Sequence, residues 1–202
     1  RTGFRPDAPP YAVRGPHPVG FVTFSDGDPD RPMEGGIWYP AIQPEGVEEA
    51  IVYDAGVGDI VPVLNNVAGR AILDAEPDTA AGPYPLVISS HGLGGPIYAI
   101  AYVHEQLASH GFVVMAPIHP GNTWRDNIMV DTDEAWAAFV EATFESMVMR
   151  PLDISQTLDY AEVLAAPDGD MAGVIDMEQV GVIGYSFGGY TALAAAGSHL
   201  DF

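Results

Sequence analysis

The chain has 202 residues, of which 48% are hydrophobic and 17% are charged, enough for one globular domain with a buried sheet. Seven basic residues stand against 28 acidic ones, and the formal net charge of −21 disfavours nucleic acid and anionic membranes as partners. The absence of cysteine excludes disulfides, thiolate catalysis and sulfur-ligated zinc. No apolar run reaches the roughly 18–20 residues that span a bilayer, so no membrane span is predicted.

The first third of the chain predicts an irregular region around one hairpin. Residues 1–16 contain four prolines and are expected to form an extended leader. Two β-rich segments, 18–26 and 35–41, flank a turn-rich stretch and predict an antiparallel hairpin. Residues 60–73 have the pattern of a short helix within an otherwise weakly patterned region.

Strands and helices alternate from residue 85 onward. Continuous apolar runs at 85–90, 112–117 and 179–185 are typical of strands buried on both faces. The expected helices cover 97–111, 131–149, 150–166 and 187–197, with Pro151 in the first turn of the third of these. This alternation predicts one α/β domain with a mostly parallel sheet and helices on both faces.

The stretch IGYSFGGYTAL, residues 183–193, places Ser186 between a predicted strand and a predicted helix. A G-x-S-x-G sequence in this context is the layout of a nucleophile elbow. The turn brings the residues two before and two after the serine close together, and Gly184 and Gly188 leave room for that approach. Ser186 is therefore the candidate nucleophile; the alternative is a glycine-rich turn with a capping serine.

A second glycine-rich segment, SSHGLGGP at 89–96, also follows a buried strand and precedes a helix. Acyl transfer passes through a tetrahedral oxyanion, which two fixed backbone N–H groups can stabilise. The residue after the nucleophile, Phe187, supplies one such donor, and Leu93 is the candidate for the other. The alternative, a phosphate-binding loop, lacks both the P-loop lysine and the dinucleotide-binding glycine spacing.

Five blocks of sequence, from about residue 18 to the end, resemble one family. They are RPMEGGIWYPA, VISSHGLGG, LASHGFVVMAPIHPGNT, RPLDISQTLDY and VGVIGYSFGGYTALAAAG. In order and style they resemble the bacterial platelet-activating-factor acetylhydrolase-like and dienelactone-hydrolase-like α/β hydrolases. The resemblance implies an α/β-hydrolase fold and carboxylic-ester hydrolysis through an acyl-serine, with no cofactor and no metal. Dienelactone hydrolases themselves use a cysteine nucleophile, which this chain lacks.

The histidine and acid of a catalytic triad are not found at usable positions. In α/β hydrolases both follow the serine, and here only His199 and Asp201 do so. A helix rises about 1.5 Å per residue, which puts His199 roughly 18–20 Å from Ser186. His91 is expected to hold the loop around it, and His119 is a candidate for the wall of the pocket. We therefore expect the acid and the histidine outside this chain.

This expectation extends to the fold. The 202 residues are predicted to be the N-terminal part of one α/β-hydrolase domain whose C-terminal strands are missing from this chain. The remainder would complete the sheet, either as a separate fragment or as more of the same polypeptide. Without it, the strand at 179–185 would be a bare apolar edge.

The leading functional hypothesis is a serine carboxylesterase for small-molecule esters with short or medium acyl chains. The alternatives are a serine peptidase of the prolyl-oligopeptidase kind and a non-catalytic binding protein with the same fold. Residues 121–149 are a candidate cap insertion, in which Trp124 is the candidate substrate-binding residue. The acidic surface suits a salty or extracellular setting, so we expect a secreted or periplasmic protein.

Overall fold

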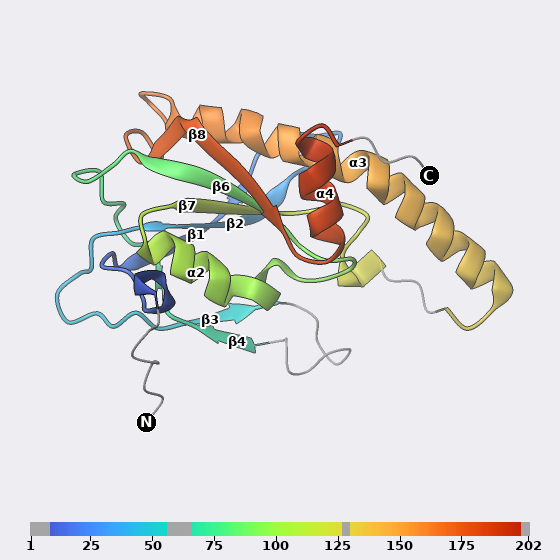
Figure 1. The fold of residues 1–202 in the computed structure, drawn as a ribbon, viewed down its shortest axis with the longest axis horizontal. Coiled ribbons are helices and arrows are strands. Elements are labelled where there is room, and N and C mark those ends of the chain that lie inside the picture. Colours follow the sequence, from blue (N-terminus) through green and yellow to red (C-terminus); the bar gives the residue numbers. More distant parts are fainter. Residues whose placement is uncertain (1–8, 56–65, 127–129, 199–202) are drawn as a thin grey trace.

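The computed structural model describes residues 9–55, 66–126 and 130–198, and its main feature is a six-stranded mixed sheet (Figure 1). The strand order is β5–β1–β2–β7–β6–β8. The strands are β1 Val19–Ser25, β2 Glu34–Pro40, β5 Ile72–Leu73, β6 Tyr84–Ser90, β7 Val113–Ile118 and β8 Ile175–Gly184. Within this sheet only β2 runs against its neighbours, so the prediction of a mostly parallel α/β sheet is confirmed.

The predicted hairpin is present as β1 and β2, which pair antiparallel from Val19↔Pro40 to Ser25↔Glu34. Carboxylates close its turn: Asp26 accepts from the backbone N–H of Met33, and Asp28 accepts from that of Asp30. Ahead of the hairpin, a 3-10 turn, η1 (Pro10–Ala12), lies in the predicted leader.

The predicted helix at 60–73 is wrong where the structure describes it. Residues 60–65 lie outside the described residues. β4 (Asn66–Gly69) instead pairs antiparallel with β3 (Ile51–Asp54), and β5 joins the main sheet beside β1. Pairing with β3 satisfies the backbone hydrogen-bonding groups that a helix would have paired internally. Gly69 also disfavours a helix, because a glycine in a helix interior costs about 1 kcal/mol relative to alanine.

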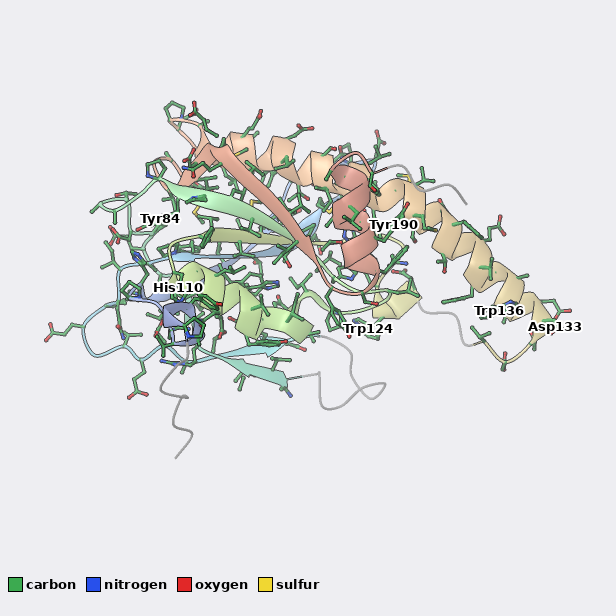
Figure 2. The ribbon with its side chains drawn as sticks, viewed as in Figure 1. Tyr84, His110, Trp124, Asp133, Trp136 and Tyr190 are labelled. Carbon is green, nitrogen blue, oxygen red and sulfur yellow. The ribbon has the colours of Figure 1, made fainter. Side chains whose placement is uncertain are left out.

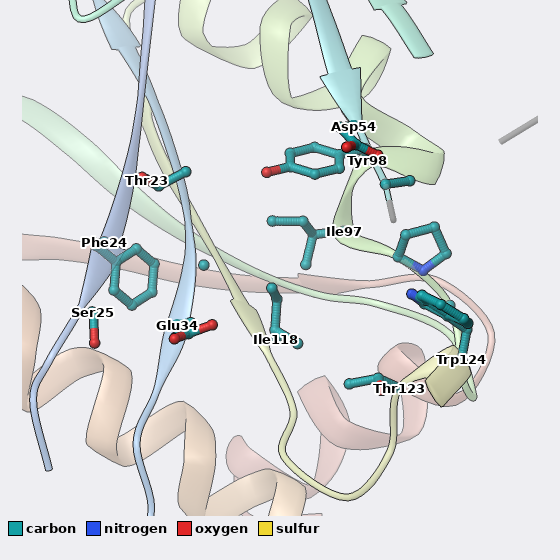
Figure 3. A pocket seen from close by; sticks show the side chains of 14 residues that line it. Thr23, Phe24, Ser25, Glu34, Asp54, Ile97, Tyr98, Ile118, Thr123 and Trp124 are labelled. Atoms are coloured by element: carbon teal, nitrogen blue, oxygen red, sulfur yellow. The ribbon is translucent and has the colours of Figure 1, made fainter. Parts of the chain in front are cut away.

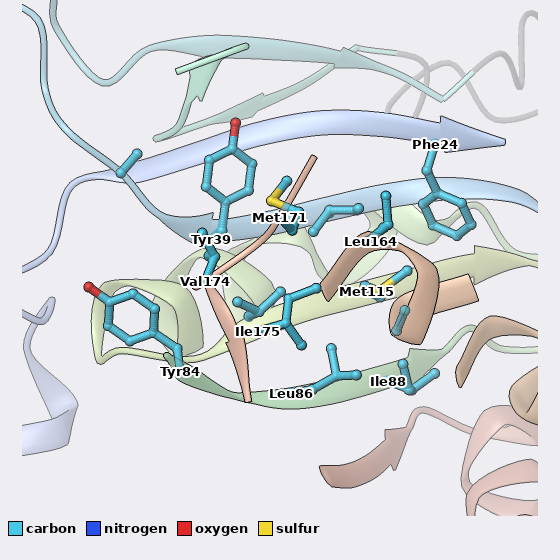
Figure 4. Close-up of a cluster of buried hydrophobic side chains, with 14 of the residues drawn as sticks. Phe24, Tyr39, Tyr84, Leu86, Ile88, Met115, Leu164, Met171, Val174 and Ile175 are labelled. Atoms are coloured by element: carbon cyan, nitrogen blue, oxygen red, sulfur yellow. The ribbon is translucent and has the colours of Figure 1, made fainter. Parts of the chain in front are cut away.

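Helices cover both faces of the sheet, as predicted (Figure 1). One face packs on α2 (Ala101–Ser109), which follows a 3-10 turn, η2 (Ile97–Ile100); the other packs on α3 (Asp133–Ala165) and α4 (Phe187–Ala195). Successive side chains of the central strands point to opposite faces of the sheet. On β6, Leu86 and Ile88 pack in the hydrophobic cluster on the α3 side (Figure 4), whereas Val87 packs in the cluster on the α2 side. Burial on both faces explains the continuous apolar runs of β6 and β7. The same burial predicted for 179–185 is wrong, because β8 is an edge strand whose residues 178–181 are exposed.

α3 is one helix of 33 residues, not the two predicted at 131–149 and 150–166. Pro151 has no N–H and leaves the carbonyl of Met147, four residues earlier, without its helical donor. The hydroxyl of Tyr190 on α4 donates to that carbonyl at 2.9 Å, so the helix continues through the proline. Its described buried side chains begin at Ser146, and the turns before this point, around Asp133 and Trp136, project beyond the sheet (Figure 2).

Candidate active site

Ser186 lies in a sharp turn between β8 and α4. Its backbone has φ 54° and ψ −118°, a left-handed conformation that is unfavourable for a residue with a Cβ. A Cβ placed on Gly184 would lie 1.9 Å from the carbonyl oxygen of Gly188, so the close approach predicted from the two glycines is present. The turn exposes Ser186 to solvent and sets its side chain at the N-terminus of α4, where the helix dipole favours negative charge.

The loop after β6 packs directly against this turn. A Cβ placed on Gly188 would lie 1.9 Å from the carbonyl oxygen of Ser90, and one placed on Gly92 would lie 3.5 Å from the Cβ of Ser186. The backbone N–H of Tyr185 also donates to the carbonyl of Ser90, at 3.2 Å. Two segments that are far apart in sequence are thus joined backbone to backbone at the carboxyl end of the sheet.

Both backbone groups proposed as oxyanion donors are available in this arrangement. Phe187 is the first residue of α4, so its N–H has no partner inside the helix. Leu93 lies one residue beyond Gly92 and is 39% exposed. Gly94 adopts φ 60°, a conformation that favours glycine and turns the loop back. Among the described residues, neither the Leu93 nor the Phe187 N–H donates a hydrogen bond that fixes it elsewhere.

His91 holds the loop through both of its ring nitrogens. Nε2 accepts from the backbone N–H of His119 at 3.1 Å, so Nδ1 carries the proton and donates to the carbonyl of Gly92 at 2.7 Å. Burial, with further contributions from His119 and Arg150, holds the pKa of His91 well below its usual value. A neutral, fully engaged imidazole orients the loop and does not move protons.

A buried chain of side chains lies behind the loop, and no pattern in the sequence indicated it. The Ser90 hydroxyl donates to Nε2 of His119, whose Nδ1–H donates to Asp153 on α3, each at 2.8 Å. Asp153 also pairs with Arg31 from the β1–β2 turn. The order serine, histidine, aspartate is that of a hydrolase triad, but all three residues are fully buried. His119 is therefore not in the pocket wall where the sequence placed it, because this network holds it beneath the end of the sheet.

Arg150 of α3 connects this chain to the site. It is fully buried, and its Nη2 donates to Ser90 Oγ at 3.0 Å and to the carbonyl of His91. Nη1 donates to Oδ1 of Asn122 at 2.9 Å, and the guanidinium lies 4.7 Å from the centre of the Phe187 ring. Burial lowers the pKa of Arg150 to about 10, which leaves it charged near neutral pH.

Trp124 lies in the 3-10 turn η3 (Trp124–Asp126) after β7 and lines a cavity of about 560 Å³ (Figure 3). Pro96 and Tyr98, which follow the glycine-rich loop, line the same cavity, and the ends of β1 and β2 close its far side. The aromatic residues farther along the predicted cap lie elsewhere: Trp136 and Phe144 are more than half exposed, and Trp136 stacks on Phe139.

No histidine of the described residues bonds to the Ser186 hydroxyl. His104 and His119 bond to Ser89 and Ser90 instead. His199 and Asp201 lie outside the described residues. The structure therefore brings Ser186, Phe187 and the loop of Leu93 together, and sets Trp124 in the wall of the cavity that begins beyond that loop.

Comparison with protein-family models shows to which family the chain belongs. The family model described as platelet-activating factor acetylhydrolase, isoform II, matches residues 21–135, which is more than half of the chain. The chain belongs to this family. The match covers the hairpin, the glycine-rich loop and β7, and it confirms the resemblance inferred from the sequence blocks.

Two relatives extend this finding. A curated platelet-activating factor acetylhydrolase from Cavia porcellus is 23% identical over 192 residues, which cover 81% of this chain and 44% of that protein. The structure of a ferulic acid esterase from Streptomyces cinnamoneus matches with a TM-score of 0.63 and 25% identity, over 94% of this chain and 57% of that one. The α/β-hydrolase fold is thereby confirmed, and the chain spans less than half of the length of the curated relative.

A search of the described helices for a bilayer-spanning segment finds none that combines the necessary length with the necessary apolarity.

Proposed function

We propose that this chain carries the nucleophile and the oxyanion donors of a carboxylic-ester hydrolase that works through an acyl-serine intermediate. The observation that carries the proposal is the backbone of Ser186, held at φ 54° between β8 and α4 with its side chain exposed. Strain of this kind persists where the surrounding structure enforces it, and it clusters at functional sites. The names of both relatives, an acetylhydrolase and an esterase, support the same chemistry.

The proposed reaction has two halves. In the first, Ser186 Oγ attacks the ester carbonyl carbon while a general base takes the hydroxyl proton, and the carbonyl oxygen becomes an oxyanion facing the N–H groups of Leu93 and Phe187. The C–O bond to the alcohol then breaks, and the alcohol leaves with the proton. In the second half, water attacks the acyl-serine in the same way, releasing the carboxylic acid and restoring the serine.

We further propose that the base and its acid come from polypeptide beyond residue 202, which also covers β8. In the described sheet β8 pairs only with β6 and stands at the edge. Val180 on β8 and Tyr185 just after it are more than 40% exposed, and α3 presents Phe144, Val148 and Leu152 to solvent. Exposed apolar edges of this kind are normally paired or covered.

The proposed substrates are esters with short or medium acyl chains. The 560 Å³ cavity beside the glycine-rich loop is in the size range of small-molecule sites, and Trp124 is its proposed substrate-binding wall. A secreted or periplasmic location is proposed from the net charge of −21, and fractionation of the producing cells tests it: recovery of the protein only with cytosolic markers would contradict it.

Hydrolysis of p-nitrophenyl esters by the full-length protein tests the function. The Ser186→Ala variant should lose turnover while keeping its fold, and a fluorophosphonate should label the parent protein on Ser186. A proline-directed amide substrate separates an esterase from a peptidase. A folded full-length protein that hydrolyses neither ester nor amide and never takes the label would be a binding protein.

A further inference from the structure

Arg150 is a buried residue that contacts both sides of the candidate oxyanion hole. Its Nη2 donates to the carbonyl of His91, two residues before Leu93. Its guanidinium lies over the ring of Phe187, at 4.7 Å from the centroid. One side chain of α3 therefore contacts the loop that presents one proposed donor and the residue that presents the other.

Arg150 makes no direct ion pair among the described residues, although the nearby Asp153 charge raises the pKa of Arg150 against the effect of burial. The nearest acid on the same helix, Asp153, bonds to Arg31 and His119. Among the described residues Arg150 donates only to uncharged acceptors: the Ser90 hydroxyl, the His91 carbonyl and the Asn122 amide oxygen. Its Nε has no hydrogen-bond partner in that same part of the chain. Burying a charge in this way costs several kcal/mol, and packed apolar residues in place of buried charges are often neutral or stabilising.

A guanidinium suits this position because it is planar. It presents donors in a fixed fork, which here reach three acceptors, while its face stacks on an aromatic ring. An ammonium group is a compact point charge and cannot do both. The contacts of Arg150 thus fix the loop and the first residue of α4 relative to each other, at the end of the sheet where Ser186 stands.

We propose that Arg150 is the positioning residue of the oxyanion hole, locking the Leu93 and Phe187 N–H groups into one geometry without touching substrate. This inference rests on the proposed function. A misplaced donor weakens binding of the transition state more than binding of the ester, so Arg150 acts on kcat and leaves KM nearly unchanged.

The test compares full-length Arg150→Met and Arg150→Lys with the parent and with Arg14→Met. Arg14 is the matched control, because it also bonds a backbone carbonyl, that of Arg70, and a side chain, Glu49, away from the site. For p-nitrophenyl acetate we expect both Arg150 variants to lose kcat by about 10²-fold or more, the effect of one oxyanion donor. KM should change by less than about threefold, and affinity for a trifluoromethyl ketone should fall with kcat/KM.

Chemical rescue separates positioning from folding. Ethylguanidinium added to Arg150→Ala should restore kcat by about tenfold or more, whereas Ser186→Ala should not respond. Folded Arg150 variants with parental kcat, or with raised KM alone, would overturn the inference while leaving the ester hydrolase intact. If Arg150→Met fails to fold, Arg150→Lys and the rescue of Arg150→Ala decide, and absence of both effects overturns the inference. A parent without Ser186-dependent hydrolysis would overturn the proposed function, and this inference with it.

Discussion

Gly92 lies where a side chain would press on the candidate nucleophile. Its Cβ position is 3.3 Å from the Tyr185 ring and 3.5 Å from the Cβ of Ser186. We predict that Gly92→Val lowers kcat by about 10²–10³-fold, because the added methyl groups displace the loop and with it the Leu93 N–H. Gly92 is buried, and overpacking a buried position typically costs about 1–3 kcal/mol, so the loss of unfolding free energy should stay below about 3 kcal/mol. Ester kinetics and urea unfolding of the full-length protein measure the two effects.

Gly95 provides the comparison within the same loop. Its nearest neighbour would be 3.5 Å from an added Cβ, an ordinary contact, so Gly95→Ala should keep turnover within about threefold of the parent. Equal losses in both variants would show that the loop tolerates no substitution at all. Full activity in folded Gly92→Val would place the oxyanion hole elsewhere.

Candidate site residues that belong to short local motifs could be predicted from the sequence, whereas a residue that reaches the site from a distant helix could not. Ser186 and the 91–95 loop could be proposed from the sequence because a nucleophile elbow and its glycine-rich partner have fixed spacings. Arg150 was not found, since a single arginine in a helix has no pattern of its own. It is one of only seven basic residues in the chain, and that scarcity was the one available signal.

One hydrogen bond between α3 and α4 compensates for the N–H that Pro151 lacks: the Tyr190 hydroxyl donates to the carbonyl of Met147. Tyr190→Phe removes the donor to the Met147 carbonyl that Pro151 leaves unsatisfied. We expect this change to lower the free energy of unfolding by about 1 kcal/mol, the net value of one hydrogen bond. In a Pro151→Ala background the same change should cost less, because the introduced alanine supplies the helical N–H itself. Urea unfolding of the four proteins in this double-mutant cycle measures the coupling, and a coupling of zero would contradict the pairing.

The same contact explains why two helices were predicted where the structure has the single helix α3. A proline within a helical pattern normally ends or begins a helix, and only packing against a helix far along the chain reverses that preference. The helix predicted at 60–73 fails over its described part, 66–73, for a similar reason: β4 and β5 are stabilised there by pairing with β3 and β1. By contrast, β6 and β7 were predicted well, since burial on both faces leaves a continuous apolar run that needs no partner to recognise it. The apolar run of β8 also predicted a strand, although β8 is mostly exposed at the edge of the described sheet.

For the whole molecule, three buried histidines make stability depend on pH. Burial lowers the pKa of His104 to about 3 and that of His119 to about 4, and holds that of His91 well below the usual value. In the unfolded chain each takes up a proton near pH 6.5, so between about pH 6.5 and 4 the unfolded state binds more protons. Stability is therefore full above about pH 6.5 and falls as the pH drops, by about 1.4 kcal/mol per pH unit for each histidine.

Urea unfolding of the full-length protein between about pH 7 and pH 5 measures this slope. His104→Gln should reduce it by about 1 kcal/mol per pH unit averaged over this range, because the unfolded imidazole is only partly protonated near pH 6.5, whatever the effect of the substitution on absolute stability. An unchanged slope in that variant would mean that His104 takes up its proton in the folded protein too.

β8 forms one edge of the described sheet, so its outward-facing amides report whether further polypeptide covers it. The N–H of Tyr185 donates to Ser90 on the β6 side; because N–H groups alternate along a strand, those of Val182 and Val180 point to the open edge. If further polypeptide covers β8 as proposed, these two amides should exchange slowly with deuterium in the full-length protein and fast in the 202 residues expressed alone. The shorter polypeptide should also aggregate and lack esterase activity, since it has a bare apolar edge and no base for Ser186. A monomeric, active protein of these 202 residues would contradict this prediction and would place the general base among the residues of this chain.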